Sequence, residues 1–178
     1  MYMHKIPIFT VKTNDSSSLR NWVEYPYSLT DRLKDALGHA QLEIISQKWM
    51  NPTWWDKYLL KINDQLIFQR EILMKHQEST YWYARTIIPE QCYNVSPDFF
   101  NRLKKESIRD LIFDNNLVTR TNMTSYSINN QCIELCWAKK HIKDIHHPLW
   151  VRLAEYSFLG KGVFFLVELL LPELENVW

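Results

Sequence analysis

The sequence predicts an α+β fold, in which a single, mostly antiparallel β-sheet has helices packed on one face. Two observations support this prediction. Segments with alternating or β-branched and aromatic residues are joined in pairs by short turns, which is the spacing of β-hairpins. Helical segments with recognisable start signals stand between these hairpins, and this order indicates an antiparallel sheet covered by helices.

The first half of the chain is expected to contain short helices and three strands. Pro26 ends the first helix, Ser28 begins the second and Gly38 ends it, since these residues carry the usual boundary signals. The second and third strands form a hairpin through four polar residues. The helical or irregular segments cover residues 16–25, 28–37 and 53–61, and the strands cover 41–50, 65–75 and 80–88.

In the second half, Ser96 is expected to cap a helix that has Pro97 in its first turn and that extends toward residues 108–113. Four further segments are rich in β-branched and aromatic residues, which favours strands. These segments cover residues 117–128, 132–139, 150–158 and 163–171.

Length and composition indicate one domain over residues 1–178 and exclude several classes of protein. The 21 basic and 20 acidic residues give a net charge of +1, so no global field favours nucleic acid or an anionic membrane. No segment has the apolar length of a signal peptide or a membrane span, which predicts a cytoplasmic protein. Nucleotide-binding Gly-rich motifs are absent, and three cysteines without an export signal favour reduced thiols.

Glu168 is the most informative single residue, because it lies inside the apolar run of residues 163–171. Side chains alternate across a strand, and both faces of this segment are apolar, so the carboxyl group is expected to be buried. A buried carboxylate requires a cation, hydrogen-bond donors or a proton.

Arg70 is the candidate cation for this carboxylate. In residues 65–75 one strand face is largely polar, whereas the other carries four apolar residues beside Arg70, which therefore points into the apolar side. The pattern leaves two alternatives open. Either Arg70 forms a structural ion pair with Glu168, or its guanidinium group binds the carboxylate of a ligand through two parallel hydrogen bonds.

Arg85 and a group of Cys and His residues are weaker candidates. Arg85 shares its strand face with two tyrosines and an isoleucine, which suits either a surface position or a pocket. The Cys and His residues are poorly spaced for a metal, so no metal site is predicted, and Cys132 and Cys136 are expected to pack in the core. The residues considered as ligands were Cys132, Cys136, His141, His146 and His147.

Several local motifs occur in a fixed order along the chain. The most specific are Ala84-Arg85-Thr86 with Pro89, and Glu168 with Leu171-Pro172. The others are Trp22 followed by residues 28–33, the Arg-Glu pair at 70–71, Leu149-Trp150 with Arg152, and Gly160-Lys161. Together these motifs resemble the chorismate lyase family over roughly residues 19–174. Members of that family remove pyruvate from chorismate and leave 4-hydroxybenzoate.

This resemblance implies helical flaps over an internal ligand cavity and a role for each of five residues. Arg70 would hold the ring carboxylate, Glu168 would hydrogen-bond the ring hydroxyl, and Leu29 and Ile108 would line the pocket. Arg85 would lie in an inner cavity that substrate or product passes through. The implied ligands are chorismate and 4-hydroxybenzoate, with no metal or organic cofactor. The family also suggests a monomer that supplies a ubiquinone precursor.

Two features keep alternatives open. Ser107-Ile108-Arg109 stands where the family usually has Pro-Leu-Gly, and the arginine would either block a close backbone approach or add a third cation. Effector-binding modules of some transcription regulators resemble the same fold without catalysing a reaction, and a diverged lyase could make another hydroxybenzoate isomer. About twenty residues precede the first expected helix, too few for a DNA-binding domain, which favours the enzyme.

Overall fold

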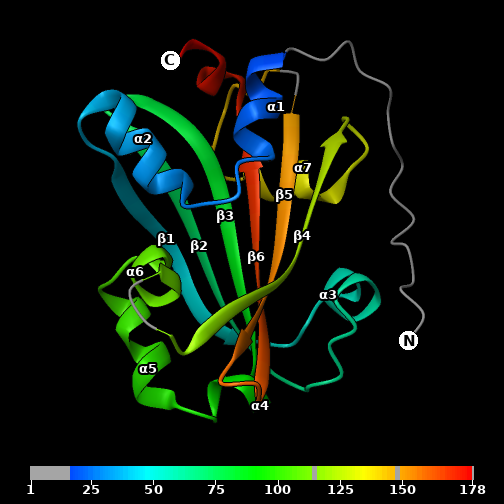
Figure 1. Cartoon of the computed structure of the whole chain (residues 1–178). Coiled ribbons are helices and arrows are strands. Elements are labelled where there is room, and N and C mark those ends of the chain that lie inside the picture. Colours follow the sequence, from blue (N-terminus) through cyan, green and yellow to red (C-terminus); the bar gives the residue numbers. More distant parts are fainter. Residues whose placement is uncertain (1–16, 114–115, 147–148, 178) are drawn as a thin grey trace.

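The computed structural model describes residues 17–113, 116–146 and 149–177. Its centre is a six-stranded sheet with the strand order β1-β2-β3-β6-β5-β4, in which every neighbouring pair is antiparallel (Figure 1). The predicted α+β class with an antiparallel sheet is confirmed. The strands are β1 (Gln41–Met50), β2 (Ile67–His76), β3 (Ser79–Pro89), β4 (Val118–Ile128), β5 (Leu149–Phe158) and β6 (Gly162–Leu170).

Short helices stand between the strands, and they cover both faces of the sheet. The first face packs against α1, α2, α5 and α6, whereas α3 and α7 contribute to a separate hydrophobic cluster on the second face. The helices are α1 (Ser17–Val23), α2 (Leu29–Leu37), α3 (Trp54–Leu59), α4 (Glu90–Tyr93), α5 (Pro97–Asn101), α6 (Ile108–Phe113) and α7 (Ile133–Ala138), with 3-10 helices η1 (Arg102–Lys104) and η2 (Pro172–Asn176).

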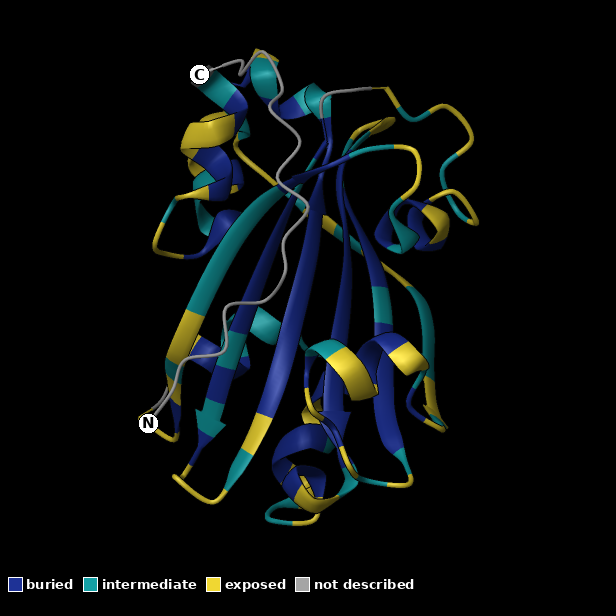
Figure 2. Ribbon diagram, turned by 90° about the vertical axis from the view of Figure 1, so that its right-hand side faces the viewer, coloured by how far each residue is buried: buried dark blue, intermediate teal, exposed yellow. Residues whose placement is uncertain are grey.

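The sequence predicted helices on one face of the sheet only, and this detail is wrong because helices cover both faces. The central strands β3 and β6 are buried over most of their length, whereas the edge strands β1 and β4 carry more exposed residues (Figure 2). Strands that are apolar on both faces must be covered on both faces, because exposed apolar surface is costly. On the second face Trp55 of α3 and Trp137 of α7 meet edge to face, with ring centroids 5.0 Å apart.

Residues 132–139 were expected to form a strand and instead form α7. The buried residues of this helix are Glu134, Leu135, Trp137 and Ala138, which is the spacing of one helical face. The prediction of a strand rested on composition, which does not show this helical spacing of the buried residues. Cys136 is exposed and Cys132 is half-buried, so the expectation that both pack in the core was wrong for Cys136. The helix that begins at Pro97 also ends earlier than expected, because η1 and a break near Ser107 separate it from α6.

The strand register decides which side chains share a face. Arg70 on β2 lies opposite Thr86 on β3, and Ala84 on β3 lies opposite Glu168 on β6. Glu168 in turn lies opposite Arg152 on β5. Directly paired residues of antiparallel strands point to the same side, so these five residues occupy the first face.

Among the helices formed by the described residues, none combines the length and hydrophobicity of a membrane-spanning segment.

Candidate functional site

A small chamber lies between the first face of the sheet and the helices α2 and α6. Its lining includes Arg70, Glu168, Thr30 at the start of α2, and Ile108 and Arg109 at the start of α6. Its volume is about 20 Å³, which is space on the order of a single water molecule. Two polar residues that the sequence singled out therefore border one enclosed space, although they are about a hundred residues apart in the chain.

The floor of the chamber is low because the strand between Arg70 and Glu168 carries small side chains. Ala84 and Thr86 of β3 line the chamber beside Ile72 and Leu166. From the strand order and register, Arg70 and Glu168 are two strand spacings apart, about 10 Å, and are offset by about 7 Å along the strands. The two charged groups thus approach the chamber from opposite sides of a shallow floor.

Arg70 is almost completely buried, with 1% of its surface exposed. Its Nη2 atom donates a hydrogen bond to the backbone oxygen of Glu106 at 3.0 Å, whereas its buried Nε atom has no hydrogen-bond partner. Burial lowers the pKa of the Arg70 guanidinium to about 10, so the group remains charged at neutral pH. A buried cation with unused donor capacity is chemically suited to an anionic ligand.

The alternative in which Arg70 and Glu168 form a structural ion pair is wrong, because the ion-pair partner of Glu168 is Arg152. The Arg152 Nε and Glu168 Oε2 atoms are 3.2 Å apart, and both side chains are almost fully buried. Neither atom makes a hydrogen bond with good geometry. Burial raises the pKa of the Glu168 carboxyl, and the guanidinium groups of Arg152 and Arg120 oppose that rise.

Two short helices close the chamber, and their starts are fixed by local hydrogen bonds. The Ser28 hydroxyl accepts a hydrogen bond from the Asp31 amide at 3.1 Å and caps α2. Ser107 and Asp110 bond reciprocally at the start of α6, since the Ser107 hydroxyl donates to Asp110 at 2.8 Å and accepts from its amide at 3.3 Å. Each flap helix therefore begins beside the chamber.

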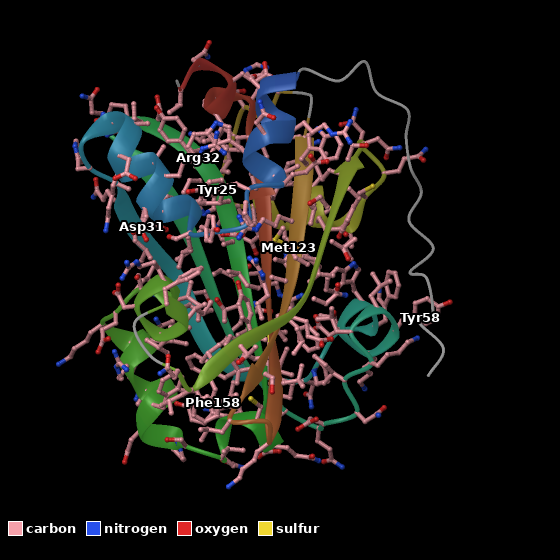
Figure 3. All side chains as sticks on the ribbon, viewed as in Figure 1. Tyr25, Asp31, Arg32, Tyr58, Met123 and Phe158 are labelled. Atoms are coloured by element: carbon pink, nitrogen blue, oxygen red, sulfur yellow. The ribbon has the colours of Figure 1, made fainter. Side chains whose placement is uncertain are left out.

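Arg109 joins the two flap helices to each other. Its Nε atom lies 3.0 and 2.9 Å from the two carboxylate oxygens of Asp31. Asp31 lies near the end of α2 that faces α6 (Figure 3). Arg109 was expected either to block a close backbone approach or to add a third cation. The geometry matches the second alternative, since Arg109 forms an ion pair with Asp31 at the mouth of the chamber.

The structure places the other expected pocket residues at different positions relative to the chamber. Ile108 lines it directly. Leu29 is 2% exposed and packs in the hydrophobic cluster of the first face, while the next residue, Thr30, is the one at the chamber wall.

Arg85 does not reach the chamber, because it points to the second face of the sheet. Its Nη1 and Nη2 atoms bind the two carboxylate oxygens of Asp56 at 2.8 and 3.0 Å, and its Nε atom donates to Gln69 at 2.6 Å. The guanidinium also lies over the Trp137 ring, 4.6 Å from its centroid. Arg85 is therefore buried, lies on the opposite face of the sheet from Arg70, and donates its hydrogen bonds to Asp56 and Gln69.

The residues considered for a metal do not assemble into a site. No group of three or more His, Cys, Asp or Glu residues suited to a metal occurs in the part of the chain that the structure describes. His147 lies outside the described residues.

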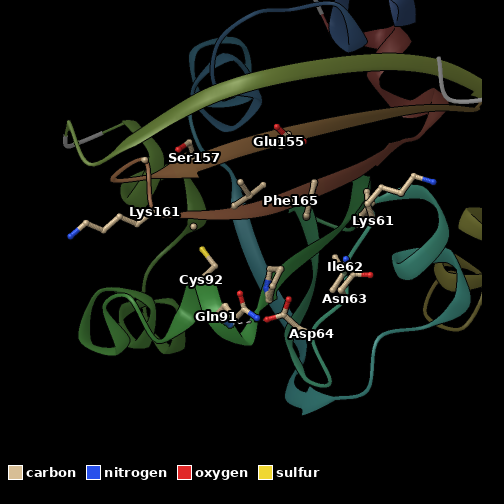
Figure 4. A pocket seen from close by; sticks show the side chains of 15 residues that line it. Lys61, Ile62, Asn63, Asp64, Gln91, Cys92, Glu155, Ser157, Lys161 and Phe165 are labelled. Carbon is tan, nitrogen blue, oxygen red and sulfur yellow. Dashed lines mark hydrogen bonds between the residues drawn. The ribbon is translucent and has the colours of Figure 1, made fainter. Parts of the chain in front are cut away.

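A larger groove of about 580 Å³ opens near the β5–β6 turn (Figure 4). Charged side chains of both signs line it, among them Lys61, Asp64, Glu155 and Lys161. The two lysines are exposed, and the two acidic residues already accept hydrogen bonds, Asp64 from the Gln91 amide and Glu155 from the Thr121 hydroxyl. The smaller chamber is the stronger candidate site, since two buried polar atoms of its lining, Arg70 Nε and Glu168 Oε2, have no hydrogen-bond partner.

Reasoning from the sequence missed the buried ion pairs of two residues, Arg152, which it noted only as part of a motif, and Asp56. Arg152 belongs to the same apolar strand face as Trp150, Ala154 and Tyr156, so the alternation that identified Arg70 would also have identified it. Asp56 is fully buried and belongs to a capping box with Thr53, whose signal is the Thr-x-x-Asp spacing at the start of α3.

Comparison with known proteins places the chain among relatives. The family model for chorismate lyase matches residues 11–176. A probable chorismate pyruvate-lyase of Shewanella sp. (strain W3-18-1) is 25% identical over 162 residues, which are 90% of this chain and 83% of that protein. A probable chorismate pyruvate-lyase of Coxiella burnetii is 28% identical over 106 residues, which are 58% of this chain and 57% of that protein.

Solved structures with a similar fold come from transcription regulators. The C-terminal domain of the histidine utilization repressor from Pseudomonas syringae matches with a TM-score of 0.57 and 10% identity, covering 79% of this chain and 96% of that domain. PhnF from Mycobacterium smegmatis matches with a TM-score of 0.56 and 12% identity, covering 82% of this chain and 64% of PhnF. At such identities the likeness concerns the fold alone.

Proposed function

This chain belongs to the chorismate lyase family, and from that premise we propose that it is a chorismate pyruvate-lyase that converts chorismate to 4-hydroxybenzoate and pyruvate. The observation that carries the proposal is the pair of Arg70 and Glu168 at opposite sides of one closed chamber. A para-substituted ring with a carboxylate at one end and a hydroxyl at the other suits that arrangement.

In this proposal Arg70 binds the ring carboxylate and Glu168 binds the ring hydroxyl. The unpartnered Nε atom of Arg70 supplies a donor toward the carboxylate. A raised pKa lets the Glu168 carboxyl hold a proton more readily than an exposed glutamate, so it can orient the hydroxyl or exchange a proton with it.

The reaction removes the hydrogen at C4 of the ring and breaks the ether bond to the enolpyruvyl group. The departing group becomes pyruvate once it gains a proton on its methylene carbon, and the ring becomes aromatic. Aromatisation supplies the thermodynamic driving force. The protein is left with positioning the side chain near C4, stabilising charge on the departing group and excluding water, which a dry chamber under two flaps favours.

Substrate binding requires the flaps to open, because the chamber of about 20 Å³ cannot contain a six-membered ring. The element most suited to this movement is the pair of short helices α2 and α6, which are joined across the mouth by the half-exposed Arg109 and Asp31 side chains. Opening and closing of these flaps is then part of each turnover, and release of 4-hydroxybenzoate is expected to be slow.

The proposal is tested by incubating the purified protein with chorismate and following pyruvate and 4-hydroxybenzoate together. Equal amounts of both products are expected. Arg70→Gln should lower kcat/KM by about a hundredfold or more, since it removes a buried charge partner of the substrate. Arg20→Gln, on the exposed surface of α1, is the matched control and should leave kcat/KM unchanged.

Other outcomes would favour other functions. Binding of 4-hydroxybenzoate without turnover of chorismate would support an effector-binding module, the alternative that the regulator domains of similar fold bring forward. Formation of pyruvate with another hydroxybenzoate isomer would indicate a diverged lyase. Wild-type kinetics for Arg70→Gln would remove Arg70 from the site.

A further inference from the structure

Beside Glu168 the first face of the sheet carries a surplus of positive charge that the roles of Arg70 and Glu168 leave unexplained. Arg152 is 2% exposed, and its Nη2 atom donates to the backbone oxygen of Tyr27 at 3.1 Å. Its Nε and Nη1 atoms are buried and have no hydrogen-bond partner. The Nε atom faces the Glu168 carboxylate at 3.2 Å, so Nη1 is the donor that has neither an anion nor a hydrogen-bond acceptor. A buried donor without a partner is costly unless a ligand supplies one.

Arg120 of β4 adds a second guanidinium to the same region. Its side chain is half-buried and interacts with the Tyr156 hydroxyl, its Nη1 atom is buried without a hydrogen bond of good geometry, and its charge also acts on Glu168. On this face Arg70, Arg120 and Arg152 carry three positive charges, while Glu168 carries one negative charge when ionised. A ligand with two negative charges would balance this set, whereas a ligand with one would leave one positive charge on this face uncompensated.

The chemistry of chorismate indicates where a second negative charge would lie. Its enolpyruvyl ether is on the ring carbon next to the one that bears the hydroxyl. If Glu168 binds the hydroxyl, the carboxylate of the enolpyruvyl group lies within a few bonds of Glu168. Arg152 is the nearest cation to Glu168, with its Nε atom 3.2 Å from the Glu168 carboxylate.

We propose that Arg152, supported by Arg120, binds the side-chain carboxylate of the substrate and makes the site selective for dicarboxylates over monocarboxylates. This inference rests on the proposed function and names the second anion-binding position of the same site. Arg152 then also stabilises the charge that develops on the enolpyruvyl group as the ether bond breaks. Release of pyruvate leaves the monoanionic 4-hydroxybenzoate without its second contact.

The test uses two ring ligands that cannot eliminate pyruvate. The dianion 3-(carboxymethoxy)-4-hydroxybenzoate carries both carboxylates, and 3-propoxy-4-hydroxybenzoate has nearly the same shape without the second one. Their dissociation constants are measured by isothermal titration calorimetry. Wild-type protein should bind the dianion about tenfold more tightly or better, since a charge-assisted bidentate contact is formed. Equal affinities, or tighter binding of the propoxy compound, would overturn the proposal without any variant being made.

Variants then assign the preference to Arg152. Arg152→Gln should lose the preference while binding the propoxy compound within about threefold of wild type, and Arg152→Lys should keep part of it, because a charge remains without the planar fork. Equal weakening of both ligands by Arg152→Gln would mean that Arg152 only positions Glu168, which overturns the proposal. Arg20→Gln is the matched control, and far-ultraviolet circular dichroism reports folding.

Failure of this inference is distinguishable from failure of the proposed function. If the protein turns over chorismate but does not discriminate between the two ligands, the lyase function stands and the role of Arg152 falls. If chorismate is not turned over and neither ligand binds, the proposed function falls with it.

Discussion

Replacing Asp56 tests whether the buried arginine on the second face stabilises the fold and takes no part in ligand binding. Asp56 is fully buried and binds Arg85 through both carboxylate oxygens. It also accepts hydrogen bonds from the amide and hydroxyl of Thr53 at 2.7 and 2.8 Å. Asp56→Asn keeps the size and one acceptor oxygen but leaves Arg85 buried without its counter-charge.

The expected loss can be worked from these contacts. Removal of one partner from a buried ion pair costs about 3–5 kcal/mol of the free energy of unfolding. Asp56→Ala also removes the capping box, which adds about 1 kcal/mol, so this variant should lose about 4–6 kcal/mol. Because small domains have about 5–15 kcal/mol in total, Asp56→Ala is expected to be close to unfolding at room temperature.

Urea denaturation followed by tryptophan fluorescence measures the loss, since Trp55 and Trp137 pack beside the pair. Asp144→Asn, an exposed loop residue, is the control and should change the free energy of unfolding by less than about 0.5 kcal/mol. The affinity of folded Asp56→Asn for 4-hydroxybenzoate should equal that of wild type. A loss of stability below about 1 kcal/mol, or a tenfold loss of affinity in the folded variant, would refute the structural assignment of Arg85.

Two further predictions concern the flaps and a close backbone approach. Arg109→Gln and Asp31→Asn should each raise the dissociation rate of 4-hydroxybenzoate about two- to fivefold in stopped-flow experiments. The effect is small because a partly exposed ion pair contributes at most about 1 kcal/mol. If the two effects multiply in the double variant, the two residues act independently, which would contradict a direct contact between them. Gly162→Ala should lower the free energy of unfolding by about 1–3 kcal/mol, since the new Cβ atom would lie 2.7 Å from Cys92 Sγ and 2.8 Å from its Cα. Thermal unfolding measures this loss, and a fully stable Gly162→Ala variant would show that α4 can shift away from β6.

Much of the fold could be predicted from the sequence, because the signals that specify it are local. Alternation and boundary residues identified all six strands and the start of α2 at Ser28. The failure at α7 has a physical reason. Its residues have the composition of a strand, but its buried positions follow a helical period, and a helix there covers the second face of the sheet. The second face must be covered because β3 and β6 are apolar on both faces, and these strands are distant in sequence from α7.

The candidate site was only partly predictable for a related reason. The resemblance implied that Leu29 lines the pocket, whereas the structure has Thr30 at the chamber wall. It implied that Arg85 lies in an inner cavity; the structure pairs Arg85 with Asp56 on the second face, and the inner cavity stays a prediction. Neighbouring residues on a strand point to opposite faces, so Arg85 is separated by the sheet from Ala84 and Thr86, which do line the chamber.

The sequence by itself determined that Arg70 and Glu168 are buried, since alternation within one strand assigns a side chain to a face without reference to the rest of the chain. Only the tertiary structure decided which charges meet. The order β3-β6-β5 brings Arg152 next to Glu168, and α3 carries Asp56 to Arg85. Pairing between strands depends on their order and register, and those are set by the packing of the whole sheet against its two layers of helices.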